Sequence, residues 1–289
     1  MMRLITAIVI SASLVSACGS SSHLPAITQS ETSASGLSLE LKWTLDGFEM
    51  PEGAALAANG DYYISNIAGD LTAKDGEGWI SRLSPDGRFV EQFWATGLNA
   101  PKGMVVHEGA LYVADIDTII VLDPDSGERV NSIPIDGASF LNDMGVWRGE
   151  LVVSDSSNST VYTVRNGFSS ILVELPEYAQ LNGLLENREG ELLITSMGSG
   201  ALLSYDMEHG IHTIADGLNR PDGIGIAPDG SLLVSSFPGQ VFQIGTDQSV
   251  SELLDTRRRE IMQNDLSVFG DVVVIPNLQP GTVTAWQIQ

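Results

Sequence analysis

A repeat is the feature of this sequence that most restricts its fold. One pattern recurs six times: a short apolar run, a turn rich in Gly, Asn or Asp, and a second, β-rich run. Counted from one residue near the start of each copy, the spacings are 50, 40, 40, 40 and 42 residues. Those six positions are Glu52, Lys102, Asn142, Asn182, Asp222 and Asn264. Spacing this regular predicts an array of similar structural units.

Five of the six copies also predict four strands. Short apolar and β-branched runs bounded by Gly, Asn, Asp and Pro are typical of strands joined by hairpins. Four strands in about 40 residues is the size of one blade of a β-propeller. The sixth copy lacks its fourth strand, whereas an unassigned strand-like run, residues 37–45, precedes the first copy.

We therefore expect an all-β, six-bladed β-propeller in which the N-terminal strand completes the last blade. Such closure pairs two sheet edges that would otherwise be exposed. A solenoid is the alternative architecture. It is less consistent with the sequence, because solenoids usually need atypical capping repeats rather than a strand returned from the other end of the chain.

The N-terminal residues do not fit the repeat and are typical of a targeting segment. Arg3 precedes an apolar stretch, residues 4–15, which is shorter than the roughly 20 residues that span a bilayer. Small residues follow, and then Cys18, the only cysteine in the sequence. The segment resembles a bacterial lipobox, which implies cleavage before Cys18 and lipid attachment to its thiol. An ordinary secretory signal with a chance cysteine is the alternative.

This interpretation divides the chain into three parts. Residues 1–17 are a lipoprotein signal peptide, residues 18–36 a flexible tether from lipidated Cys18, and residues 37–289 the propeller. The tether is rich in Ser and Thr and poor in large apolar residues, so it cannot bury enough surface to become ordered. We expect a location in the bacterial cell envelope, with the lipid as the only membrane contact. By resemblance to lipoprotein sorting signals, Gly19 favours the periplasmic face of the outer membrane.

The charge balance argues against one class of partner. The sequence has 37 acidic and 14 basic residues. Proteins that bind nucleic acid usually carry a basic stripe that replaces the counterions of the phosphates, and no such stripe is present. We expect a monomer that acts on a small molecule.

Blade geometry places the six repeat positions together. The innermost strand of each blade lines the central channel, and all six residues stand at its start, so they should surround one mouth of the channel. We call them the ring residues. None is a histidine or cysteine, which makes a histidine zinc site, a Ser-His-Asp triad and a cysteine nucleophile unlikely there. Carboxylates with side-chain amides suit a hard cation, Ca²⁺ best, with Mg²⁺, Mn²⁺ or Zn²⁺ as alternatives.

At these residues the chain resembles the regucalcin–gluconolactonase (senescence marker protein) family of six-bladed propellers. The matching motifs are Glu52-Gly53, Asn142-Asp143, Asn182-Gly183 and Pro221-Asp222-Gly223, in the order that the family has them. The resemblance implies that Glu52, Asn182 and Asp222 hold one divalent metal and that Asn142 lies beside it. It also implies that Asp222 is the catalytic base in hydrolysis of sugar lactones.

The sequence also departs from the family pattern. Lys102 stands at a ring position where a cation is unexpected, and its ammonium could pair with Glu52 and replace the metal. We assign Lys102, Asn142 and Asn264 to the substrate or to the surroundings of the metal.

Three alternatives remain open at this point. Asn-Gly and Pro-Asp-Gly are also ordinary turn formers, so the ring motifs could be structural. A non-catalytic propeller of the NHL-repeat type, binding a ligand or a protein, is the alternative function. Paraoxonase-like hydrolases use histidine near their metal, which this mouth lacks.

Overall fold

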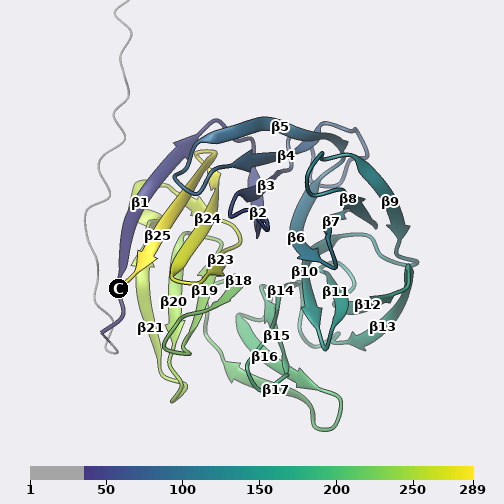
Figure 1. The fold of residues 1–289 in the computed structure, drawn as a ribbon. Coiled ribbons are helices and arrows are strands. Elements are labelled where there is room, and N and C mark those ends of the chain that lie inside the picture. The colour runs from purple at the N-terminus through teal and green to yellow at the C-terminus, as the bar shows by residue number, and fades with distance from the viewer. Residues whose placement is uncertain (1–35) are drawn as a thin grey trace, which may run out of the picture.

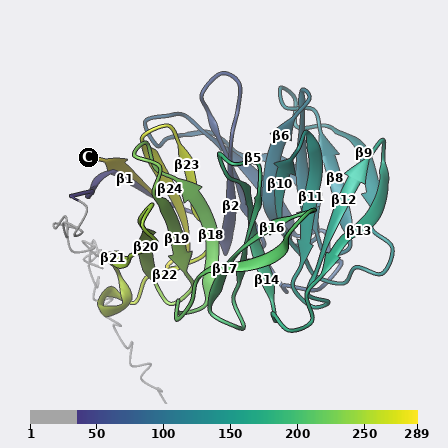
Figure 2. The ribbon, with the colours of Figure 1, turned by 90° about the horizontal axis from the view of Figure 1, so that it is seen from below.

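Six antiparallel sheets surround a central axis in the computed structural model, which describes residues 36–289. The sheets are arranged as the blades of a propeller (Figure 1), and the strands run between its two faces (Figure 2). The predicted six-bladed β-propeller is therefore confirmed. The signal peptide, almost all of the tether, and with them Cys18 and Gly19, lie outside the described residues. No helix in the part described is long and apolar enough to cross a membrane.

Each of the first three blades contains four strands in sequence order. Blade one has β2 (Pro51–Leu56), β3 (Tyr62–Asn66), β4 (Gly78–Leu83) and β5 (Phe89–Leu98). Blade two has β6 (Pro101–His107), β7 (Ala110–Asp115), β8 (Thr118–Leu122) and β9 (Arg129–Pro134). Blade three has β10 (Leu141–Trp147), β11 (Glu150–Asp155), β12 (Thr160–Arg165) and β13 (Phe168–Glu174).

The remaining blades follow the same plan, with a short 3₁₀ helix, η1 (Arg257–Arg259), before the last. Blade four has β14 (Leu181–Glu186), β15 (Leu192–Ser196), β16 (Ala201–Asp206) and β17 (Gly210–Ala215). Blade five has β18 (Pro221–Ile226), β19 (Leu232–Ser236), β20 (Gln240–Ile244) and β21 (Val250–Asp255). Blade six has β22 (Met262–Gln263), β23 (Ser267–Phe269), β24 (Val272–Gln279), β25 (Thr282–Ile288) and β1 (Leu39–Asp46).

The N-terminal strand closes the ring, as the sequence predicted. β1 is the outermost strand of blade six and pairs antiparallel with the C-terminal strand β25 from Leu39↔Ile288 to Asp46↔Thr282. Its bounds differ from the predicted residues 37–45 by a residue or two, which is normal for strand ends. Figure 1 shows the two ends of the folded chain side by side. Hydrogen bonds between the first and last strands therefore hold the circle together.

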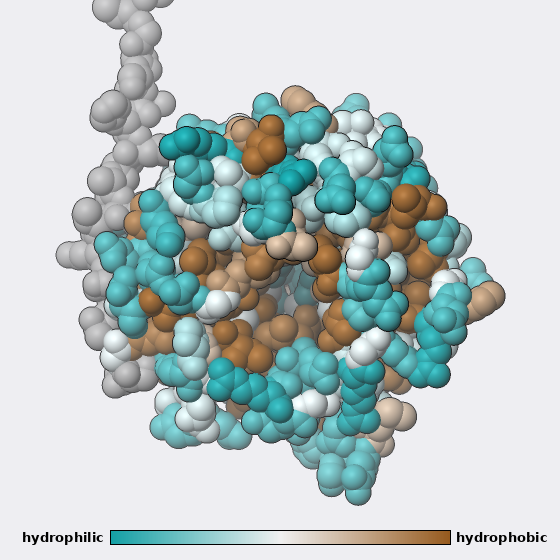
Figure 3. Space-filling view, in the orientation of Figure 1, coloured by the Kyte–Doolittle hydropathy of each residue, from teal (hydrophilic) through white to brown (hydrophobic). Residues whose placement is uncertain are grey.

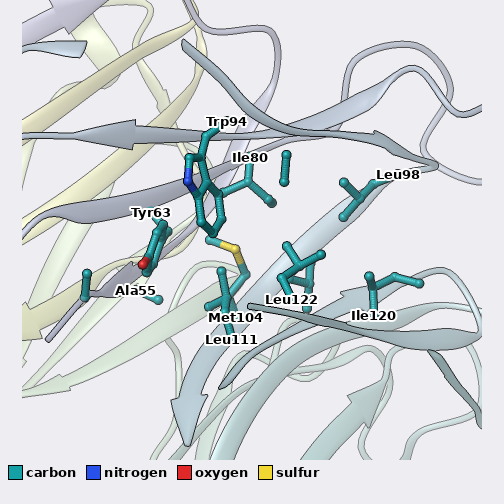
Figure 4. Close-up of a cluster of buried hydrophobic side chains, with 12 residues drawn as sticks. Ala55, Tyr63, Ile80, Trp94, Leu98, Met104, Leu111, Ile120 and Leu122 are labelled. Carbon is teal, nitrogen blue, oxygen red and sulfur yellow. The ribbon is translucent and has the colours of Figure 1, made fainter. Parts of the chain in front are cut away.

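The hydrophobic core lies between blades rather than within them. Figure 4 shows one such interface, where side chains of blade one meet those of blade two. Tyr63 and Trp94 stack with ring centroids 4.7 Å apart, and Met104 and Leu111 of the next blade belong to the same cluster. The hydroxyl of Tyr63 also donates to the carbonyl of Pro124 in blade two. Both faces of most sheets are buried in this way, which explains the nearly continuous apolar runs in the inner strands.

The centre of the propeller is hollowed. In the space-filling view of one face, hydrophobic side chains gather around a depression on the axis (Figure 3). The hollow is the end of the channel that the innermost strands line. Ligand sites are usually concave, so the axis is where a ligand is expected to bind.

Candidate functional site

The ring residues reach the channel because every innermost strand is interrupted beside them. In blade one, Pro51 pairs with Asn66 and Ala54 with Ile64, so two residues are skipped on β2 and one on β3. A β-bulge of this kind redirects a side chain and is common next to active sites. The displaced N–H of Gly53 donates to a second-strand serine, Ser65 Oγ, at 2.8 Å.

The same interruption recurs around the ring. Blades two to five have an equivalent register shift at the start of β6, β10, β14 and β18. In blade six the interruption is wider and separates β22 from β23, with Asn264 between them. The repeated bulge is therefore the local structure that presents all six ring residues.

The glycines that follow four of the ring residues are required by close packing. Gly183 and Gly223 do not have a left-handed φ, so they are not needed as turn formers. A Cβ on Gly183 would lie 2.3 Å from the carbonyl oxygen of Asp222, and one on Gly223 would lie 1.8 Å from Oδ1 of Asp265. Neighbouring bulges approach too closely near the axis for any side chain at these positions.

All six ring residues line one cavity of about 270 Å³, which we call the ring cavity. Each is buried, with no more than 7% of its surface exposed. The structure thus brings together the full set of residues that the repeat predicted: Glu52, Lys102, Asn142, Asn182, Asp222 and Asn264.

Three oxygen atoms in this cavity are buried and have no hydrogen-bond partner among the described residues. They are Oε2 of Glu52, Oδ1 of Asn142 and Oδ1 of Asp222. The amide of Asn142 is oriented by its nitrogen, which donates to Ser156 Oγ at 3.0 Å and leaves the oxygen unpaired. Buried polar atoms are nearly always satisfied, so three unpaired oxygens in one cavity fit a hard cation as the missing partner.

Amide oxygens are necessary for any such cation. Within residues 36–289 no group of three His, Cys, Asp or Glu side chains is placed to hold a metal ion. The available ligands are instead the two carboxylates, Glu52 and Asp222, with the amides of Asn142 and Asn182, a mixture that suits Ca²⁺. Asn264 has a structural contact, because its Nδ2 donates to the carbonyl of Pro51 at 3.0 Å and joins blade six to blade one.

Lys102 does not form an ion pair with Glu52 in the described structure. Its Nζ donates to the carbonyl of Ala100 at 2.9 Å and to that of Leu71 at 3.3 Å, and it lies 4.5 Å from the centre of the Phe140 ring. Burial lowers the pKa of Lys102, while the charge of Glu52 opposes that shift. The ammonium is therefore near the carboxylates, but carbonyl oxygens and an aromatic face hold it.

Burial dominates the ionisation of both candidate carboxylate ligands. It raises the pKa of Asp222 to about 7, an effect that the charge of Asp143 increases and the charge of Arg220 reduces. It also raises the pKa of Glu52 well above the usual range, and repulsion from Asp222 adds to this, while Lys102 acts in the opposite direction. Two desolvated carboxylates that repel each other provide a strong electrostatic reason to bind a cation.

A second pair of carboxylates lies immediately behind the ring. Asp143 and Asp265 each follow a ring residue, and both line a cavity of about 530 Å³ formed by the succeeding residues of the inner strands. Burial raises the pKa of Asp143 to about 7, although the backbone N–H groups of Leu184 and Met144 oppose the shift. Burial and three nearby carboxylates raise the pKa of Asp265. Sequence analysis did not single out this pair, although each takes the place that glycine has in the other four blades.

The side wall of the ring cavity was also missed. It includes Leu71 and Phe140, and the residues Met197, Arg220 and Phe237 of blades four and five. Two fixed positions in the repeat predict most of these wall residues. Phe140 and Arg220 stand two residues before a ring residue, and Met197 and Phe237 stand one residue after the end of a second strand.

Solved structures share this architecture. A gluconolactonase from Xanthomonas campestris aligns with a TM-score of 0.67 and 16% identity, over 88% of this chain and 90% of its own. A protein described as a putative gluconolactonase aligns with a TM-score of 0.66 and 16% identity, over 88% and 93% of the two chains.

A third similar structure is an inactive histidine-to-alanine variant of virginiamycin B lyase from Staphylococcus aureus. It aligns with a TM-score of 0.62 and 13% identity, over 87% of this chain and 99% of its own. No family profile and no curated protein matches the sequence. At these identities the similarity concerns the fold, and it includes the gluconolactonase type of propeller that the sequence motifs resemble.

Proposed function

We propose that this protein is a divalent-metal-dependent hydrolase that opens lactone rings in the ring cavity. The observation that carries the proposal is the set of three buried, unpaired oxygens of Glu52, Asn142 and Asp222 in one cavity. The fold shared with gluconolactonases supports it. No histidine lines this cavity, so the chemistry must come from carboxylates, amides and a cation.

Glu52, Asn182 and Asp222 would hold the cation, with Asn142 beside it. When bound, a divalent cation supplies Lewis-acid polarisation of an ester carbonyl and of water. Ca²⁺ fits the oxygen ligands best, and Mg²⁺, Mn²⁺ and Zn²⁺ are the alternatives to test.

Asp222 is the base in this proposal. Asp222 is 3% exposed, and its unpaired Oδ1 would bind the cation while its second oxygen accepts a proton from an attacking water. A base with a pKa near the working pH balances availability against proton-transfer driving force. Burial raises the pKa of Asp222, and a bound cation would lower it again. Lys102 places a positive charge at the edge of the site without occupying the cation position.

The test is hydrolysis of glucono-δ-lactone by the protein freed of metal with EDTA and then supplied with each cation in turn. We expect activity only after a cation is restored. Asp222→Asn should lower the rate by at least about 100-fold, within the usual contribution of a general base. Glu52→Gln should mainly weaken cation binding, measured by calorimetry. Ser199→Ala, which alters a hydroxyl outside the ring, is the control.

Two results would overturn the proposal. One is an unchanged melting temperature and no heat of binding with any of the four cations. The other is cation binding without hydrolysis of any lactone, which would favour a ligand-binding propeller without catalysis.

A further inference from the structure

The wall of the ring cavity has a different chemical character from its floor. The floor consists of the six polar ring residues, whereas the wall is largely apolar, with Leu71, Phe140, Met197 and Phe237 among its side chains. A site for a polyhydroxylated sugar needs hydrogen-bonding groups around the ring of the ligand. This wall instead offers apolar and aromatic surface to most of the ligand, with reactive groups at one end.

The wall contains one positively charged side chain. Arg220 lines the cavity and stacks over Phe237, with its guanidinium carbon 4.9 Å from the ring centre. Its Nη2 donates to the sulfur of Met197 at 3.2 Å, and sulfur is a weak acceptor. Arg220 forms no ion pair with any described residue, in a chain where acidic residues outnumber basic ones. The strong donors of this guanidinium are therefore available to a ligand.

The backbone at Arg220 has an unusual conformation. Arg220 has a φ of 54°, in the left-handed region that favours glycine. Gln180, at the equivalent position of blade four, has a φ of 56° and also lines the cavity. Glycine would relieve this strain at either position. The equivalent residue of blade one, Met50, has a φ of 46°, so this conformation recurs in the repeat and is not confined to residues of the cavity.

We propose that the ring cavity selects a lactone with an apolar or aromatic body and a carboxylate, and that Arg220 pairs with this carboxylate. This substrate class rests on the proposed function and makes it more specific. Phe140 and Phe237 contact the body, and Arg220 is a specificity-determining residue. Arg220 lines the same cavity as Asp222, the proposed base. A ligand whose carboxylate pairs with Arg220 can therefore place its ester over the ring residues.

The experiment uses four probes with the cation-loaded protein. Phthalide-3-acetate has the aromatic lactone and the carboxylate, phthalide lacks the carboxylate, and glucono-δ-lactone lacks the apolar body. The lactam isoindolinone-3-acetate has the same shape and charge as the first probe and resists hydrolysis. Calorimetry with the lactam measures binding without any catalytic step, and chromatography measures hydrolysis of the three lactones.

We expect the lactam to bind and phthalide-3-acetate to be hydrolysed with the highest kcat/KM of the three. Arg220→Gln should weaken lactam binding by about tenfold or more, as expected for a lost charge-assisted hydrogen bond. Arg88→Gln, which changes a solvent-exposed arginine that does not line the cavity, should leave binding unchanged. Arg220→Gly should also weaken binding while its melting temperature stays equal or rises, because the positive-φ strain is removed.

The outcomes separate the two proposals. Lactam binding that depends on Arg220, without hydrolysis of any lactone, would support the ligand class and overturn the hydrolase. Hydrolysis with glucono-δ-lactone preferred, or lactam binding unaffected by Arg220→Gln, would overturn the ligand class and leave the hydrolase intact.

Discussion

Lys102 shows how one side chain can keep a positive charge beside the ring carboxylates without forming an ion pair with Glu52. Its ammonium is held by the carbonyls of Ala100 and Leu71 and by the face of Phe140. The carboxylate of Glu52 therefore keeps one oxygen without a partner. If a cation binds in the ring cavity, we therefore expect Lys102 to repel it rather than to replace it.

Removing Lys102 should tighten cation binding. Lys102→Ala eliminates a like charge from the surroundings of the bound ion. Because charges interact more strongly in a partly desolvated site than in water, the Kd for Ca²⁺ should fall by about tenfold. Lys102→Met, which keeps most of the volume, controls for the space that alanine leaves. Calorimetric titration with Ca²⁺ measures both variants. A weaker Ca²⁺ affinity in Lys102→Met would mean that the ammonium organises the site instead.

The stability of the metal-free protein should depend on pH in a defined direction. The pKa values of Asp222 and Asp143 are about 7 in the folded chain and about 4 when unfolded. Between these values the folded state binds more protons, so the free energy of unfolding falls as pH rises from about 4 to about 7. Each pKa unit corresponds to about 1.4 kcal/mol per group.

Thermal unfolding in EDTA at pH 5 and pH 8 tests this dependence. We expect a lower melting temperature at pH 8, and recovery there on addition of Ca²⁺, which neutralises the carboxylates. Asp222→Asn should reduce the difference in melting temperature between pH 5 and pH 8. The many surface carboxylates contribute equally to this difference in both proteins. An EDTA-treated protein that is equally stable or more stable at pH 8 would contradict the assignment.

At the scale of strands, two structural features determine the architecture. The bulge at the start of each inner strand presents the ring residues, and the strand β1 closes the circle. Leu39 of β1 is 2% exposed and belongs to the core cluster shared with β25 and blade five. Trp43 of the same strand donates from its indole nitrogen to the carbonyl of Pro85 in blade one. β1 therefore stabilises both its own blade and the two interfaces beside it.

Deleting β1 should destabilise the whole propeller. A truncated chain that starts at Gly47 exposes the edge of β25 and loses the burial of several apolar side chains, each worth about 1.5–3 kcal/mol. The total is comparable with the net stability of a typical domain. We expect aggregation or a large fall in melting temperature, measured by calorimetry and light scattering. A control that starts at Gly36 should behave as the full propeller, and a Gly47 variant that stays monomeric and equally stable would disprove the role of β1 in closure.

At the scale of the whole molecule, the ring separates two cavities with different linings. The ring cavity carries the three unpaired oxygens and the wall with Arg220, and the larger cavity behind it carries Asp143 and Asp265. The ring cavity belongs to no single blade, because each of the six blades contributes one ring residue to it.

The place of this propeller in the cell is a proposal that rests on the first 18 residues. If Cys18 carries lipid, wild-type protein should partition into detergent. Cys18→Ser should then release soluble protein or leave uncleaved precursor in the membrane. Phase separation with a mild detergent, followed by immunoblotting of membrane and periplasmic fractions, measures both. Wild-type protein recovered entirely in the periplasmic fraction would disprove the anchor.

The sequence by itself determined the architecture and the six ring positions. Blade number, closure by the first strand and the residues at the channel mouth all follow from a repeat of nearly constant length, because each copy folds into the same local unit. Any residue at a fixed place in that unit must return to the same place around the axis. Glu52 and Asp222 could therefore be placed together although 170 positions separate them.

Only the tertiary structure decided what the ring residues contact. Three observations depend on neighbouring blades. Lys102 donates to carbonyl oxygens, and three ring oxygens, those of Glu52, Asn142 and Asp222, have no partner. The close approach of the blades also excludes a Cβ from Gly183 and Gly223. The sequence motifs of these glycines are equally typical of turns. The distance between neighbouring blades decides between the two explanations, because it would leave an added Cβ only 2.3 Å or 1.8 Å from the nearest atom. The packing of the whole circle sets that distance, and no local pattern encodes it.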